Sequence, residues 1–220
     1  MSRISIANNA LMRIGVTRFI ESLAEATVEA QVISRVFDSV RRAQLRRMEW
    51  SFAKQIVKLA LTQYSQKPWQ YVYRYPNALR VFRLTDQGAW GYTTNASDIE
   101  PYMPGQAIVH PMSYEQIAKK KVPFESLVIN EQKVICTDLA LASAVVVTDV
   151  TDTELFDPLF EELLTWELAK AISIPLSVSK SMAEYATQQA QVAFDMAQAA
   201  TLDEFVPGEE GLPDMLKARL

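Results

Sequence analysis

A long amphipathic pattern sets the strongest limit on the fold of this chain. It begins at Thr27 and runs into the segment 48–53, which contains Trp50 and Phe52. At helical spacing its residues separate into a broad apolar face and a polar face, as in a helix packed on a core. The apolar face holds Val28, Val32, Ile33, Val36, Phe37, Val40 and Ala43, and the polar face holds Gln31, Ser34, Arg35, Asp38, Arg41 and Arg42.

Arginines interrupt this pattern at its C-terminal end. Arg46 falls on the edge of the apolar stripe and Arg47 near its middle, where an arginine must be paired or reach solvent. Within the monomer, arginine stems that extend from the helix end to solvent account for both residues. The basic group could also contact DNA phosphates or acidic groups of a neighbouring subunit, and an acidic chain favours the subunit contact. The predicted inter-subunit contact consists of Arg41, Arg42, Arg46 and Arg47.

The middle of the chain has strand patterns instead of helical ones. Aromatic residues alternate with other residues over 69–75, which is the strongest strand signal, and further strands are expected over 79–84 and 144–148. A hairpin is predicted over 124–136, with its turn at 130–132. Glycines and prolines are frequent over 88–123, where we expect short strands and loops.

Helical patterns frame this middle region. Helical spacing predicts a first helix over 2–14, and helices return at Asp157-Pro158, an N-cap residue followed by a proline. A last long helix begins near Ser179 or Ser181. Alanines recur on one side of it at heptad spacing, which lets another helix approach closely: Ala186, Ala190, Ala193, Ala197 and Ala200.

The predicted fold is therefore α+β and mainly α. The N- and C-terminal helices form one helical bundle, and a β-rich region is inserted in the middle. The expected parts are residues 1–53 and 153–202 for the two portions of the bundle, 54–152 for the β-rich region and 203–220 for a flexible C-terminal tail.

Composition excludes several classes of protein. A net charge of −4 argues against a generic surface for gripping DNA or membranes, although DNA could still pass beside the protein. Cys136 is the only cysteine, so no internal disulfide is possible and an oxidising compartment is not implied. We find neither a signal peptide nor a transmembrane run, and expect synthesis in the cytoplasm.

No combination of residues forms a recognisable catalytic motif. His110 is the only histidine and has no local motif around it. Glycine is too sparse for a phosphate-binding loop. Helix capping and a solvated loop explain the acidic cluster better than a cation site does, since it lacks the EF-hand pattern. The cluster is Asp149, Asp152, Glu154 and Asp157.

We therefore expect no enzymatic activity, no cofactor and no metal, and two alternatives remain open. One is a metal-dependent hydrolase that uses Glu161 or the acidic cluster. The other is a single-stranded nucleic-acid-binding protein whose aromatic strand stacks bases. The aromatic residues in question are Trp69, Tyr71, Tyr73 and Tyr75, for which a core or subunit-contact role is the preferred interpretation.

The order of short motifs resembles one known family, the head–tail adaptors of short-tailed phages, also called tail tubular protein A. The resemblance runs from about residue 4 to 200 and is weak over 88–121 and after 203. It rests on Ala7-Asn8-Asn9-Ala10-Leu11, Ile14-Gly15, Ile20-Glu21-Ser22-Leu23, Leu45, Trp50-Ser51-Phe52-Ala53, Trp69-Gln70-Tyr71-Val72-Tyr73-Arg74-Tyr75-Pro76 and Leu168-Ala169-Lys170-Ala171-Ile172-Ser173-Ile174-Pro175-Leu176.

This resemblance implies a structural virion protein of the phage neck and tail. Similar proteins form a dodecameric ring between the portal protein and the tail nozzle protein, in some cases with tail fibres or tailspikes attached. The ring surrounds the channel through which DNA leaves, without specific DNA binding. For this chain we predict that the end of the tail docks on the portal, through Leu212, Met215, Leu216, Lys217, Arg219 and Leu220.

Overall fold

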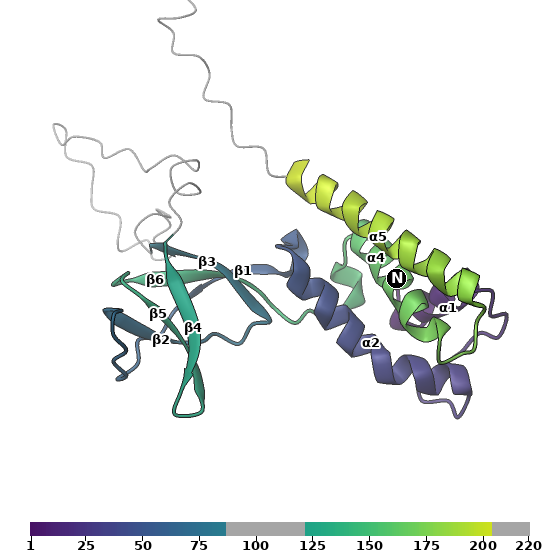
Figure 1. Ribbon diagram of the computed structural model, residues 1–220, viewed down its shortest axis with the longest axis horizontal. Coiled ribbons are helices and arrows are strands. Elements are labelled where there is room, and N and C mark those ends of the chain that lie inside the picture. Colours follow the sequence, from purple (N-terminus) through teal and green to yellow (C-terminus); the bar gives the residue numbers. More distant parts are fainter. Residues whose placement is uncertain (87–121, 204–220) are drawn as a thin grey trace, which may run out of the picture.

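A computed structural model describes residues 1–86 and 122–203 of the chain. Within these residues the fold is mixed α+β, with four helices and two antiparallel sheets of three strands each, so the predicted α+β class is confirmed. The helices gather in one half of the molecule and the strands in the other (Figure 1). The chain starts in the helical half, crosses to the strands and returns to the helices.

Helix α4 lies at the centre of the helical half. The other three helices, α1, α2 and α5, each pack against it, and ten of its residues are buried. The buried residues lie on most sides of the helix, as expected for a helix enclosed by neighbours. The bounds are α1 (Arg3–Arg13), α2 (Val28–Arg47), α4 (Pro158–Ser173) and α5 (Lys180–Asp203).

Capping side chains fix where the helices begin. Ser2 and Thr27 accept hydrogen bonds from backbone N–H groups of the first turns of α1 and α2. Asp157 accepts from two N–H groups of α4 and is followed by Pro158, so the predicted start of this helix is confirmed. The hydroxyl of Ser179 accepts from the Met182 N–H at the start of α5, one of the two predicted positions.

Helix α2 is shorter than the amphipathic pattern suggested. It ends at Arg47, and a short 3-10 helix, η1 (Ser51–Ala53), leads into the first strand. Trp50 is buried where the helices meet the sheets, donating through its indole N–H to the Gln44 carbonyl at 2.9 Å. Because the chain turns after Arg47, Trp50 and Phe52 lie at the junction of the two halves.

The strands form two small sheets with the orders β1-β6-β3 and β2-β5-β4. A tight turn at Asn130 and Glu131, both with positive φ, joins β4 to β5 and confirms the predicted hairpin. A shared apolar cluster lies between the sheets, with Tyr73, Leu84, Ile135 and Val146 among its members. The bounds are β1 (Lys54–Lys58), β2 (Tyr71–Arg74), β3 (Arg80–Asp86), β4 (Phe124–Ile129), β5 (Gln132–Thr137) and β6 (Ala142–Val147).

The core of the helical half extends into the first sheet. Val147 at the end of β6 is fully buried in the helical cluster, and Leu79 and Phe82 pack against the same cluster. The Arg83 guanidinium of β3 pairs with the Glu49 carboxylate at 2.5 Å. Apolar packing and an ion pair thus connect the two halves.

Candidate subunit-contact surface

Arg41 lies inside the protein and not on the polar face of α2. Its side chain is 3% exposed, and its guanidinium donates to the Asp149 carboxylate at 2.6 Å and to the Val150 carbonyl. The placement of Arg41 on the solvent face is therefore wrong. The buried face of α2 is rotated from the predicted one, and consists of Ala30, Ile33, Phe37, Arg41, Gln44 and Leu45.

Arg42 and Arg46 are exposed at the surface of α2. The Arg42 side chain is 57% exposed, and its Nε lies 3.1 Å from the other oxygen of Asp149. Arg46 donates to the Leu79 carbonyl at 3.2 Å, and Arg80 donates in return to the Arg46 carbonyl at 3.2 Å. The second bond satisfies a carbonyl of the last helical turn, which has no partner inside the helix.

Arg47 connects three helices. Its guanidinium donates to Gln44 at 3.0 Å and to the Glu167 carboxylate of α4 at 3.2 Å. It also lies over the ring of Phe194 of α5, 3.4 Å from the ring centroid. Glu167 is 8% exposed and takes a second cation, Lys170, at 2.9 Å. A buried carboxylate thus has two positive partners, as its burial requires.

The four predicted contact arginines therefore differ in what they can offer to another molecule. Arg41 is buried, whereas Arg42, Arg46 and Arg47 keep exposed side chains, although Arg47 also pairs with Glu167 of α4. The contact of these arginines with a second subunit stays a prediction, and the buried Arg41 is the member that is not available for it.

The alanine side of α5 is covered by the chain's own helices. Ala186, Ala190, Ala193 and Ala197 are all at most 6% exposed, and α5 packs on α4. The close approach that the alanines allow thus serves an intramolecular helix pair. This finding removes the alanine seam as a surface for another copy.

A different side of α5 carries exposed apolar residues. Tyr185, Val192 and Met196 are 47%, 44% and 61% exposed, and their spacing of seven and four residues puts them on one stripe. Exposed Ala199 continues this stripe. We call Tyr185, Val192, Met196 and Ala199 the α5 row.

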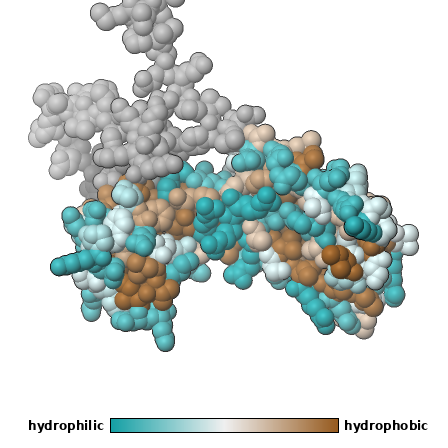
Figure 2. Space-filling model, viewed as in Figure 1, coloured by the Kyte–Doolittle hydropathy of each residue, from teal (hydrophilic) through white to brown (hydrophobic). Residues whose placement is uncertain are grey.

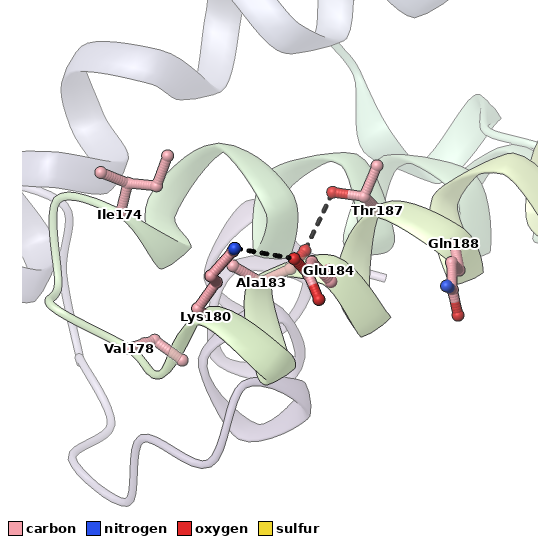
Figure 3. A pocket seen from close by; sticks show the side chains of 7 residues that line it. All are labelled: Ile174, Val178, Lys180, Ala183, Glu184, Thr187 and Gln188. Carbon is pink, nitrogen blue, oxygen red and sulfur yellow. Dashed lines mark hydrogen bonds and ion pairs between the residues drawn. The ribbon is translucent and has the colours of Figure 1, made fainter.

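A shallow hollow of about 590 Å³ lies beside the start of α5. Figure 3 shows Ile174 and Val178 of the preceding loop on one side and residues of α5 along the other. Ile174 is 81% exposed, and the Lys180 ammonium lies 3.7 Å from the Glu184 carboxylate at the rim. The hollow combines an apolar wall with an exposed ion pair at its rim, which suits contact with another protein better than chemistry.

A third apolar surface follows the outer flank of α2. Val28 is 62% exposed, and Val32, Val36 and Val40 are half-buried at intervals of four residues, followed by exposed Ala43. We call these five residues the valine row. Figure 2 shows apolar surface along α2, below the polar outer surface of α5. The predicted apolar face of α2 is thus divided, because Ile33 and Phe37 face the core and the valine row borders solvent.

Three carboxylates of the acidic cluster, those of Asp149, Asp152 and Asp157, have structural partners. Asp149 pairs with two arginines, and Asp152 and Asp157 accept backbone N–H groups at the starts of helical turns. The predicted capping role of Asp157 is thereby confirmed. Within the described residues no three side chains of the metal-binding types come together. The pairing of Asp149 was missed because its partners lie more than 100 positions earlier.

The aromatic strand is largely internal. Tyr73 is 2% exposed and donates its hydroxyl hydrogen towards the carbonyls of Leu139 and Ala140, at 2.8 and 2.6 Å. Burial raises the pKa of the Tyr73 hydroxyl above its ordinary value, and burial likewise raises the pKa of the Cys136 thiol. Tyr71 and Tyr75 are half-buried beside the same core. The predicted core role of these tyrosines is confirmed for Tyr73.

Two predicted features lie outside the described residues. One is His110, and the other is the docking segment with Leu212, Met215, Leu216, Lys217, Arg219 and Leu220. A comparison with models of known protein families and with curated proteins found no match to this chain. In the part of the chain that is described, no helix is both long and apolar enough to cross a bilayer.

Proposed function

We propose that this chain is a structural connector of a short-tailed phage or prophage. The observation that carries the proposal is the set of large apolar side chains left exposed on α2, on α5 and in the loop after α4, with Val28 at 62%, Met196 at 61% and Ile174 at 81%. Exposed apolar rows along a helix, such as the α5 row, mark sites of protein contact. The resemblance to head–tail adaptors indicates which assembly supplies the contact.

In this proposal the helical half acts as one bundle, and the β-rich region is inserted between its two portions. Copies of the bundle stand side by side in a ring, dodecameric by resemblance, between portal and tail nozzle. DNA passes through the ring without being bound specifically, since the chain is acidic overall. The end of the C-terminal tail docks on the portal. The protein carries out no chemistry and works in the virion neck after its synthesis in the host cytoplasm.

Mass measurement tests this function. Light scattering of the purified protein, alone and then mixed with portal rings of a short-tailed phage, should show a complex whose added mass equals a full ring of copies. A chain ending at residue 203 should fold but fail to join the portal rings, because it lacks the docking segment. An acidic protein of similar size serves as the control for non-specific association.

Two results would contradict the proposal. A protein that never changes the mass of portal rings is not a connector of this kind. A chain ending at residue 203 that binds portal as well as the full chain does would remove the tail from the mechanism, while leaving the ring itself in place.

A further inference from the structure

The partly buried valine row of α2 and the exposed α5 row are bordered by charges of opposite sign. Helix α2 contains five arginines and two acidic residues, and exposed Arg35, Arg42 and Arg46 run beside its valine row. Helix α5 contains three acidic residues and one lysine. Exposed Glu184 and Asp195 run beside the α5 row, and Lys180 is paired with Glu184.

Helical geometry places each charged line on one flank of its apolar row. On α2, Arg35, Arg42 and Arg46 lie on the side of the valine row that is turned away from the core. On α5, Glu184 and Asp195 likewise flank the α5 row on one side. Each helix therefore has an apolar row with polar residues along one side. These residues are basic on α2, and on α5 they are acidic residues and glutamines.

We propose that the valine row of one copy of this chain docks on the α5 row of the next copy. The inference deepens the proposed connector function by naming the two faces that meet in the ring. Apolar side chains of the two rows would bury one another, and the arginines of α2 would lie against Glu184 and Asp195 of the neighbour.

The charges also decide which faces meet. Two α2 faces in contact would set arginines against arginines, and two α5 faces would set carboxylates against carboxylates, which costs free energy in both cases. Only the contact between unlike faces joins opposite charges. Such a contact is heterologous, so it repeats from copy to copy and closes into a ring when the rotation allows. Helices α2 and α5 lie on different sides of α4 (Figure 1), as this repetition requires.

Site-specific cross-linking tests the contact. Ser39→Cys puts a thiol at the border of the valine row, and Val192→Cys puts one in the α5 row. Both positions lie near the middle of their helices, so they come close whichever way the two helices run. The natural thiol of Cys136 is fully buried, and the unmodified protein therefore measures the background.

The full-length double variant, treated with a short bismaleimide at high protein concentration, should give a ladder of cross-linked species up to the full ring. Each single variant alone should give no cross-link above background. An equal mixture of the two single variants should give dimers and nothing larger, because each copy then has one reactive face.

A matched control is available on the same helix. Ser34 and Ser39 are both exposed, and each hydroxyl donates to the carbonyl three residues earlier. The two positions are about 140° apart around the helix. A double variant with Ser34→Cys and Val192→Cys should therefore stay uncross-linked under the same conditions.

Three outcomes would overturn the inference. Cross-linking of either single variant with itself means that like faces meet. A double variant without a ladder, in a protein whose mass shows an oligomer, places the subunit contact elsewhere and leaves the connector function intact. A protein that is monomeric at high concentration and with portal rings, and gives no ladder, overturns both this contact and the proposed function.

Discussion

At the scale of single residues, Arg41 is the side chain whose role is most sharply defined. It is enclosed by α2 and the segment that follows β6, and its charge is balanced by Asp149, with Asp38 at 3.5 Å on its other side. A buried charge is tolerated when it is paired and hydrogen-bonded, and losing its partner contacts is costly. Arg41 therefore holds the segment after β6, with Asp149 and Val150, against helix α2.

We expect Arg41→Ala to lower the free energy of unfolding by roughly 2–3 kcal/mol, because it removes hydrogen bonds to a charged group and packed aliphatic stem. Chemical denaturation measures this change. Arg35→Ala is the control, since Arg35 is exposed on the same helix, and it should change stability by less than about 0.5 kcal/mol. Equal effects of the two substitutions would show that Arg41 is solvated in solution.

Sequence reasoning grouped four arginines of α2 but did not distinguish the buried Arg41 from the three exposed ones. Helical periodicity locates the buried face of a helix only approximately, because the apolar stripe is broad. Arg41 lies at the edge of the predicted stripe, so its burial could not be predicted. Its partner Asp149 is distant in the sequence, so no local spacing could reveal the pair. Arg46 and Arg47 were correctly singled out as departures from the pattern, although Arg47 contacts its own chain.

At the scale of elements, β2 and β5 contain two buried groups that ionise in alkaline solution. Val72 and Tyr73 of β2 pair with Cys136 and Ile135 of β5, so the Tyr73 hydroxyl and the Cys136 thiol belong to one small sheet. Burial raises the pKa of both groups in the folded state. The unfolded chain therefore loses these two protons at a lower pH than the folded protein does.

Stability should accordingly fall as pH rises. The contribution of Cys136 is fully present below its ordinary pKa of 9.0 and is lost above it, and that of Tyr73 is lost above 10.0. Each group contributes a slope of at most about 1.4 kcal/mol per pH unit. Denaturation at pH 8 and at pH 10.5 should show a lower free energy of unfolding at the higher value.

Two variants separate the groups in this measurement. Cys136→Ala should remove the part of the loss that begins near pH 9, and Tyr73→Phe should remove the part that begins near pH 10. Tyr73→Phe should also cost about 1 kcal/mol at pH 8, since the carbonyls of Leu139 and Ala140 lose a donor. A pH dependence unchanged by both substitutions would assign the loss to other groups.

The elements themselves were the most predictable part of the fold. Capping residues, proline and helical spacing located α1 and α4 closely, and alternation with a short turn located the β4–β5 hairpin. Which helices pack against each other was harder to predict from the sequence. Alanines at heptad spacing show that some helix approaches α5 closely, but nothing local in the sequence shows that this helix is α4 of the same chain.

At the scale of the whole molecule, the backbone passes between the two halves at one place. Lys54 at the start of β1 is the register partner of Val147 at the end of β6. The Thr148 N–H donates to the Ala53 carbonyl at 3.0 Å, and the Thr148 hydroxyl lies 3.2 Å from the same oxygen. The chain therefore leaves the helical half and returns to it through two neighbouring backbone segments.

Excision of residues 54–147, with Ala53 joined to Thr148 by two or three glycines, should give a folded helical protein. Its free energy of unfolding should be lower by roughly 2–4 kcal/mol, because Leu79 and Val147 no longer cover the helical core. Circular dichroism and thermal unfolding measure this. Excision of residues 54–136 is the control, since it leaves β6 without partners and should fold poorly.

The hydrogen bond between Ala53 and Thr148 has an evolutionary consequence as well. The segment 54–147 lies between these two residues. Insertions, deletions or replacements within it should leave the helical half folded, provided that Ala53 and Thr148 stay adjacent. We therefore expect the sequences of related proteins to differ most in the segment 54–147, as antibody sequences differ most in the loops of a common scaffold.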